Sequence, residues 1–186
     1  MKKIINTLLE FFELTLIGAL VFVIVYIFIG QLLEVSGNSM EPTFHDKEQI
    51  VAEKLTINIS NINRGDVVIF NDPAEKDKLV IKRVVGLPNE KIKIENGSIY
   101  INGNLLEETY LSKDTYTNLK YNHKLKEGEE YEIGKDSYIV LGDNRDNSRD
   151  SREWGALHRN SIIGRALLVY YPLKDIGLVI NKQATK

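Results

Sequence analysis

Hydrophobic residues are spread unevenly along this chain, with one long uninterrupted run near the N-terminus and only short runs after it. Residues 14–33 (LTLIGALVFVIVYIFIGQLL) contain no charged side chain. About 20 helical residues at about 1.5 Å each match a hydrocarbon core about 30 Å thick, so this run predicts one transmembrane helix. The alternative is a cleavable signal peptide, but its apolar region of about 7 to 15 residues and its Ala-x-Ala-like end are not seen here.

The charges that flank this run predict its orientation in the membrane. Lys2 and Lys3 precede it and Glu34 follows it. Because positive residues favour the cytoplasmic side, we expect a cytoplasmic N-terminus. Residues 1–33 are therefore predicted as a cytoplasmic N-terminus and single-pass anchor in the cell membrane, and residues 34–186 as an extracytoplasmic domain.

Beyond residue 33 the pattern changes to short runs of β-forming residues separated by turn residues. No amphipathic helix of comparable strength is present. The predicted strands occupy residues 49–55, 66–70, 78–86, 91–94, 98–101, 138–142 and 166–171. The fold class is therefore mainly β, with a single transmembrane helix followed by one antiparallel β domain.

A hairpin is the clearest local element of this domain. In KIKIENGSIYI the pair Asn96-Gly97 favours the positive φ angles of a two-residue type I′ turn. This register pairs Ile94 with Ile99 on one face and places Ile92 opposite Ile101 on the same face. Residues 107–135 are polar, tyrosine-rich and poorly periodic, which is typical of a surface excursion. We expect a smaller excursion or cap over about residues 89–137 that contains the hairpin.

Composition and charge narrow the classes of function. The formal net charge is −2, so there is no electrostatic reason to expect a nucleic-acid partner. The chain contains no cysteine, which excludes a disulfide framework, a thiolate nucleophile and a cysteine-based metal site.

A serine directly after the apolar run is a candidate nucleophile. Ser39 lies in VSGNSMEPTF, among Gly37, Asn38 and Pro42, which favour a tight bend. A serine on such a bend can present its hydroxyl and its backbone N–H to a carbonyl. The alternative is a turn residue with no chemical role, and a nucleophile would require a base.

Histidine is the usual base, but none of the three histidines has a convincing setting. His45 follows a turn, His123 lies in the polar excursion and His158 precedes a predicted strand. Surface or packing roles fit each of them better.

Lys82 is the alternative base, because it lies inside the strand-like run LVIKRVV. With alternation of period two, Val80, Lys82 and Val84 share one face. Burial penalises the ammonium form and lowers a lysine pKa toward about 7 to 8, which leaves an amine able to accept a proton. The competing interpretation is a strand lysine that extends to solvent.

The loop at residues 142–155 (GDNRDNSRDSREWG) alternates acids with arginines. Either it is a solvated loop, or it forms a paired platform in which Asp150 and Arg152 bind each other and orient Ser148. A metal loop built on Asp143, Asp146 and Asp150 is a rival interpretation. The EF-hand spacing is absent, and the nearby arginines would repel a cation.

Four motifs in this order after a membrane span resemble the type I signal peptidases, in the bacterial and organellar branch that uses a Ser/Lys dyad. They are GNSMEPT (37–43), RGDVVIF (64–70), KRVVGLP (82–88) and GDNRDNSRDSR (142–152). The resemblance covers essentially the whole chain.

The resemblance implies a role for five residues. Ser39 would be the nucleophile and Lys82 the general base. Ser148 would hydrogen-bond the lysine amine, and Asp150 and Arg152 would form a supporting ion pair.

The sequence departs from the family pattern at three places. Gly37 stands where some members have a hydroxyl residue that stabilises the oxyanion, which gives the Ser39 N–H more of this role and leaves Ser36 as a substitute. Asn89-Glu90 replaces a Gly-Asp pair, and asparagine tolerates the left-handed conformation of such a turn. His158 replaces a proline, with a minor structural effect.

The function expected from this resemblance is a membrane-bound serine endopeptidase that cleaves signal peptides from exported preproteins through an acyl-enzyme. Its partners would be signal peptides and the lipid bilayer, with no metal or cofactor. The sequence does not determine the oligomeric state or the preferred preproteins. One alternative is a specialised pilin or conjugation-protein peptidase of the same family. Others are a non-enzymatic membrane-tethered β module and, with weaker support, a self-cleaving repressor.

Overall fold

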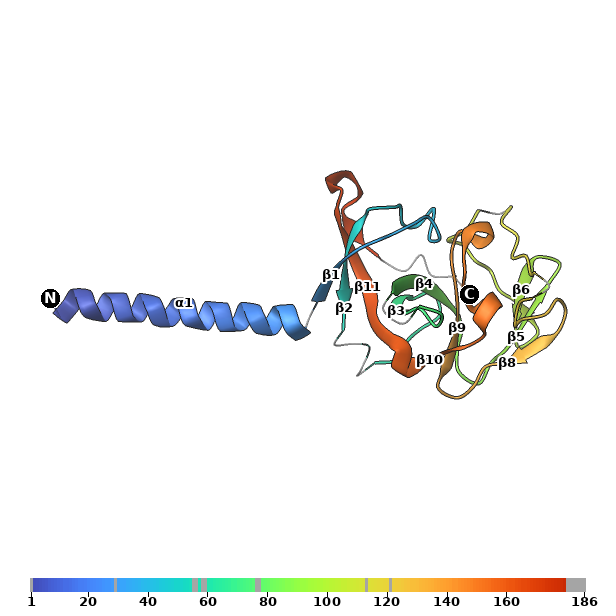
Figure 1. Cartoon of the computed structure of the whole chain (residues 1–186), viewed down its shortest axis with the longest axis horizontal. Helices are drawn as coiled ribbons and strands as arrows, with labels where there is room; N and C mark the ends of the chain where they lie inside the picture. Colours follow the sequence, from blue (N-terminus) through green and yellow to red (C-terminus); the bar gives the residue numbers. More distant parts are fainter. Residues whose placement is uncertain are drawn as a thin grey trace.

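A long helix and a β domain make up the chain, as the computed structural model shows (Figure 1). The structure describes residues 2–28, 30–54, 57, 60–75, 78–112, 114–120 and 122–179. The end of the first predicted strand at residue 55 and the end of the chain from residue 180 lie outside the described residues. Helix α1 extends away from the β domain, and the strands β5, β6 and β8 lie at the end of the domain farthest from it (Figure 1).

Helix α1 spans Lys2–Phe28 and leaves its apolar side chains exposed up to Val23. Within it, Lys3–Val23 is long and apolar enough to cross a membrane, with a mean hydropathy of 1.8 and no burial inside the protein. This is one candidate membrane span by length and composition, in agreement with the predicted N-terminal span. Exposed apolar side chains on an isolated helix indicate an environment other than water.

The predicted bounds of this helix, residues 14–33, are wrong at both ends. The helix begins at Lys2, and strand β1 (Gly30–Glu34) takes up the last residues of the uncharged run. β1 pairs with β2 (Gln49–Glu53) from Gly30↔Glu53 to Glu34↔Gln49. Hydropathy alone cannot distinguish the end of an apolar helix from an apolar edge strand, because the hydrogen-bonding partner lies elsewhere in the chain.

The larger sheet contains eight strands in the part of the chain that is described. Their order is β1-β2-β11-β3-β4-β9-β10, with β12 paired to β11, and every pairing is antiparallel. This agrees with the predicted antiparallel β fold. The further strands of this sheet are β3 (Val67–Asn71), β4 (Leu79–Gly86), β9 (Ser137–Leu141), β10 (Leu157–His158), β11 (Ile162–Tyr171) and β12 (Gly177–Leu178).

The smaller sheet has the order β7-β6-β5-β8 and contains the predicted hairpin. Ile92 pairs with Ile101 and Ile94 with Ile99, as predicted, and all four side chains are buried. The turn residue Asn96 has a φ of 51°, as a type I′ turn requires. The strands are β5 (Lys91–Glu95), β6 (Ser98–Ile101), β7 (Asn104–Leu105) and β8 (Glu130–Glu132).

Residues 107–135 are not only a surface excursion, contrary to the prediction. Their strand β8 pairs with β5, and Tyr110, Thr117, Leu125 and Ile133 are buried. The segment is polar overall, and its few inward side chains are spaced irregularly. No hydrophobic period in the sequence therefore reveals them.

Short helical turns complete the described structure. Two of them, η1 and α3, lie in the loop at residues 142–155 that follows β9. Their bounds, with those of the remaining turns, are η1 (Arg145–Asn147), α3 (Ser151–Trp154), η2 (Arg159–Ser161) and η3 (Leu173–Asp175).

Candidate active site

Ser39 lies on the loop that joins β1 to β2. Backbone hydrogen bonds between Val35 and Glu48 and between Lys47 and Val35, each 2.8 Å long, close the base of this loop. The side chains of Met40 and Phe44 are buried in the core of the larger sheet. The loop is therefore anchored on both sides of a half-buried serine.

Lys82 lies in the middle of β4, between β3 and β9, and its side chain is buried. Its Nζ is hydrogen-bonded to Ser39 Oγ at 2.7 Å and donates to the carbonyl of Ile81 at 2.9 Å. The interpretation of Lys82 as a strand lysine that extends to solvent is therefore wrong. The sheet brings together two groups that are 43 positions apart in the sequence.

Burial lowers the pKa of Lys82 from 10.5 to about 8. The carboxylates of Asp150, Asp143 and Asp72 oppose this effect by attracting the ammonium form, and Arg152 adds to it. Desolvation is the largest influence, because the amine is removed from water, and its hydrogen-bond partners among the described residues are a hydroxyl and a carbonyl. A substantial fraction of the amine is therefore neutral near pH 8, where it can accept a proton from a hydroxyl.

Asp150 and Arg152 pair as predicted. Arg152 Nε donates to Asp150 Oδ1 at 2.8 Å, and its Nη2 donates to Oδ2 at 2.9 Å. The same carboxylate accepts from the backbone N–H of Gly142 at 3.1 Å and from that of Arg152 at the start of α3. This ion pair therefore joins α3 to the end of β9.

The hydrogen bond from Ser148 to the Lys82 amine, which the resemblance implies, is not formed. Ser148 Oγ is buried and has no hydrogen-bond partner among the described residues. The amine instead bonds Ser39 and the carbonyl of Ile81. The Ser148 side chain packs beside Gly142, whose missing Cβ leaves room for it and for the Ser39 carbonyl.

The three histidines and the acids considered as metal ligands have other contacts in the structure. His45 is exposed and faces Glu41 at 3.8 Å, and His123 and His158 accept hydrogen bonds from backbone N–H groups near them in the sequence. Of the acids proposed as metal ligands, Asp143 and Asp150 each pair with an arginine. Within the described ranges, no group of three potential ligands is arranged to hold a metal ion.

The backbone N–H of Gly37 is already engaged, since it donates to Asp46 Oδ1 at 2.7 Å. Gly37 has a φ of 87°, in the left-handed region that favours glycine. A side chain with a hydroxyl at this position would be strained. The glycine here therefore has a conformational role in the turn before Ser39.

A cavity of about 190 Å³ adjoins Ser39 and Lys82. Its walls come from the end of β1 and the residues after it on one side, and from the start of β4 on the other. Leu33, Ile69 and Ile81 supply apolar surface. The cavity therefore combines apolar walls with direct access to the Ser39 and Lys82 side chains.

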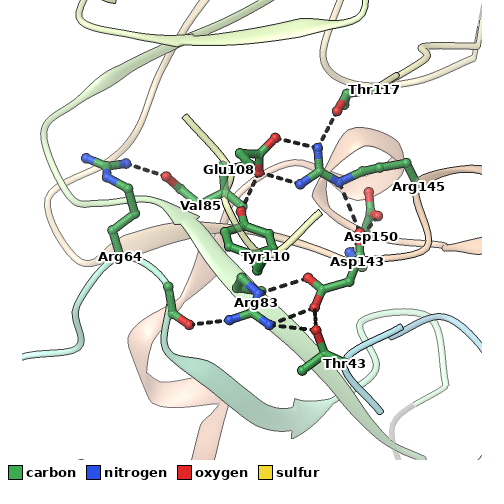
Figure 2. Close-up of polar contacts among 12 residues, drawn as sticks. Thr43, Arg64, Arg83, Val85, Glu108, Tyr110, Thr117, Asp143, Arg145 and Asp150 are labelled. Carbon is green, nitrogen blue, oxygen red and sulfur yellow. Dashed lines mark hydrogen bonds and ion pairs between the residues drawn. The ribbon is translucent and has the colours of Figure 1, made fainter. Parts of the chain in front are cut away.

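Sequence reasoning missed a buried polar network behind this site (Figure 2). Arg83 binds Asp143 through two hydrogen bonds of 2.9 and 2.7 Å, and Thr43 donates to the same carboxylate at 2.5 Å. Arg145 binds Glu108, a residue of the polar excursion. The alternating charges of residues 142–155 indicated pairing within the loop, but these two partners come from distant segments.

The β scaffold and the site define a class of proteins that pair a serine hydroxyl with a buried lysine amine. A sequence model described as "Signal peptidase, peptidase S26" matches residues 8–171, and the chain belongs to this family.

Named relatives cover nearly the whole chain. Signal peptidase I T of Bacillus subtilis (strain 168) is 34% identical over 177 residues, which cover 94% of this chain and 91% of that protein. Signal peptidase IB of Staphylococcus aureus (strain MRSA252) is 30% identical over 197 residues, which cover 95% of this chain and 98% of that protein. A crystal structure of a signal peptidase I from Enterococcus faecalis V583 is 27% identical, with a TM-score of 0.45, and the match covers 57% of this chain and 97% of that one.

Proposed function

We propose that this protein is a membrane-anchored serine endopeptidase that removes N-terminal signal peptides from exported preproteins. The observation that supports this most directly is the 2.7 Å hydrogen bond between Ser39 Oγ and the buried amine of Lys82. Membership of the signal peptidase family supplies the substrate class. Ser39 is the nucleophile and Lys82 is the general base.

The reaction begins with the neutral amine of Lys82. It takes the proton of Ser39 as Oγ attacks the carbonyl carbon before the scissile bond, which gives a tetrahedral intermediate. The lysine then returns this proton to the leaving amine, and the C–N bond breaks to leave an acyl-enzyme. Water, deprotonated by the same amine, releases the signal peptide and restores Ser39.

The Ser39 backbone N–H is the oxyanion donor that we assign, because the loop closed by residues 35 and 48 holds this backbone in place. Gly37 has no side chain that could act as a donor. The chemistry therefore depends strongly on the exact position of the loop. Asp150 and Arg152 support that position through Gly142.

The apolar helix α1 supports a location of the site at a membrane surface. Lys2 and Lys3 favour a cytoplasmic N-terminus, so the domain after α1 lies outside the cytoplasm, at the cell membrane. Ser39 follows the end of α1 by only 11 residues. Cleavage therefore takes place close to the bilayer, where the end of a signal peptide emerges.

The test is cleavage of a purified preprotein by the full chain in detergent. Ser39→Ala and Lys82→Ala should each abolish cleavage, while the exposed controls Ser112→Ala and Lys174→Ala should keep wild-type rates. A serine-reactive probe should label the wild type at Ser39. Cleavage that persists in a folded Ser39→Ala or Lys82→Ala protein would rule out the dyad.

A further inference from the structure

A carboxylate of the polar excursion is connected to the nucleophile loop by a continuous set of polar contacts. Glu108 lies on the segment after β7, outside the four sequence motifs, and its side chain is 12% exposed. Its partner Arg145 follows β9 in the loop at residues 142–155, and that side chain is 1% exposed. The contact joins the segment after β7 to the loop at residues 142–155 (Figure 2).

Both carboxylate oxygens of Glu108 are used. Oε2 accepts from Arg145 Nη1 at 2.8 Å, and Oε1 accepts from Arg145 Nη2 and from the hydroxyl of Tyr110. Thr117 Oγ1 accepts a further hydrogen bond from Arg145. A guanidinium is always charged, so Glu108 provides the negative charge that a buried Arg145 requires.

From Arg145 the contacts lead to the backbone beside the nucleophile. Arg145 Nε donates to the carbonyl of Gly142 at 3.1 Å. The neighbouring Asn144 donates from its backbone N–H to the Ser39 carbonyl and from Nδ2 to the Asn38 carbonyl, each at 3.1 Å. The loop that carries Ser39 is thus held by a segment whose position Arg145 fixes.

A second route leads from Glu108 to the strand of the base. The Tyr110 ring, oriented by its hydroxyl contact with Glu108, lies 4.1 Å from the guanidinium carbon of Arg83. Arg83 follows Lys82 directly on β4 and binds Asp143. A cation over the face of an aromatic ring is attracted to it, and burial strengthens this attraction. Glu108 therefore binds Arg145 directly and reaches Arg83 through Tyr110. Arg145 fixes the segment that holds the Ser39 loop, and Arg83 is the neighbour of Lys82 on β4.

We propose that Glu108 is a positioning residue for peptide-bond cleavage, acting through Arg145 on the Ser39 loop and through Tyr110 on Arg83. This inference rests on the proposed function, because it presumes that Ser39 and Lys82 carry the reaction. Glu108 does not line the cavity beside Ser39 and Lys82, whose walls come from residues 33–36, 39, 69 and 78–82. Its loss should therefore affect the chemical step and not substrate binding.

The magnitude follows from geometry. A misplacement of about 1 Å at a reacting group can cost roughly 100-fold in rate. Glu108→Gln keeps the shape of the side chain and removes the charge, so it should lower kcat by roughly 10- to 100-fold and leave KM within about threefold. Tyr110→Phe keeps the ring over Arg83 and should lower kcat by a smaller factor.

The experiment measures kcat and KM on a preprotein for the full chain in detergent, at a temperature well below the unfolding midpoint of each variant. Glu107→Gln is the matched control for the charge change, because Glu107 is the exposed neighbour of Glu108. Tyr116→Phe is the control for the hydroxyl, since Tyr116 is 63% exposed. Both controls should keep wild-type kcat. Wild-type kcat in Glu108→Gln, or an effect on KM alone, would overturn the proposal.

A paired replacement separates positioning from stability. Replacing a buried ion pair by apolar residues often preserves stability, so Glu108→Leu combined with Arg145→Met should unfold at a temperature close to the wild type. Its kcat should stay low, because the hydrogen bond to Gly142 is gone. Recovery of kcat together with stability would show a purely structural pair and contradict the proposal.

The proposed function has its own, separate readout. Activity in Ser39→Ala would contradict the dyad whatever Glu108 does. Wild-type kcat in Glu108→Gln with an inactive Ser39→Ala would contradict only the positioning role.

Discussion

Lys82 shows how one side chain acquires its chemistry from its surroundings. An exposed lysine is almost entirely protonated at neutral pH, and an ammonium ion cannot accept a proton. In the strand β4 the amine is buried beside a hydroxyl and a carbonyl, with carboxylates only at longer range. Keeping the charged form in this site costs about 3 kcal/mol more than in water.

The pH dependence of cleavage follows from the lowered pKa of Lys82. As the proposed general base, Lys82 acts in its neutral form, so kcat/KM should rise about tenfold per pH unit below about pH 8 and level off above it. Between pH 8 and 10.5 the enzyme lysine is neutral where an ordinary lysine is charged. Steady-state kinetics on a short peptide over pH 6 to 10 checks this. A rise centred near pH 10.5, or a flat profile, would contradict the assignment of the base.

Ser148, in contrast to Lys82, does not make the contact expected of it. The motif GDNRDNSRDSR predicted its place beside the site, and the residue indeed lies next to Gly142. Its hydroxyl has no partner in the described part of the chain, although the resemblance implies a bond to Lys82. The motif indicated which residues are near one another, but the hydrogen-bond partner of the hydroxyl depends on how the side chains around it pack.

At the scale of elements, the site depends on the close approach of two loops. The loop after β9 lies against the loop that carries Ser39, through the hydrogen bonds of Asn144 and a close approach at Gly142. A Cβ at Gly142 would lie 2.5 Å from both the Ser39 carbonyl oxygen and Ser148 Cβ. Real Cβ atoms do not approach so closely, so one of the two loops would have to move.

Gly142→Ala should therefore lower kcat/KM by roughly 10- to 100-fold by displacing the Ser39 loop. The matched control is Gly134→Ala, because a Cβ there would meet its nearest neighbour, Ser137, at an ordinary 3.5 Å. Preprotein cleavage and the temperature of unfolding should be measured for both. Full activity in Gly142→Ala would show that the two loops can move apart without affecting cleavage.

The local elements were predictable where a short sequence contains all of its own signals. The hairpin at Asn96 is an example, because turn and strands are adjacent and the isoleucines alternate. The end of α1 was not predictable, since the pairing of β1 with β2 involves residues about 20 positions away. The burial of Tyr110 was hidden for the same reason, because its partner Arg83 lies 27 positions earlier, on β4 of the larger sheet.

At the scale of the whole molecule, helix and domain have separate tasks. In the proposed function α1 holds the protein at the bilayer, and the β domain contains both groups of the proposed dyad. The strand β1 belongs to the domain, since it pairs with β2 and leads directly into the Ser39 loop. A truncation that removes the helix and keeps the β domain intact must therefore leave the chain from Gly30 onward.

A variant that begins at Gly30 should keep the site and lose the anchor. It should cleave a short soluble peptide at a rate close to that of the full chain, and membrane-inserted preproteins about tenfold more slowly or worse, because tethering raises the effective concentration. Parallel assays on the two substrates in lipid vesicles test this. Equal relative loss on both substrates would argue against presentation at the membrane. A second variant that begins at residue 35 lacks β1 and should lose stability as well.

The sequence by itself determined the apolar anchor, the antiparallel β class, the hairpin register and the identity of Ser39 and Lys82 as candidates, because these depend on local patterns and on motifs of adjacent residues. Only the tertiary structure decided that the two side chains lie 2.7 Å apart, that Lys82 is buried and that Glu108 stands behind the site. The physical reason is that burial and charge pairing are properties of side chains gathered from distant segments. A linear sequence does not show which segments meet.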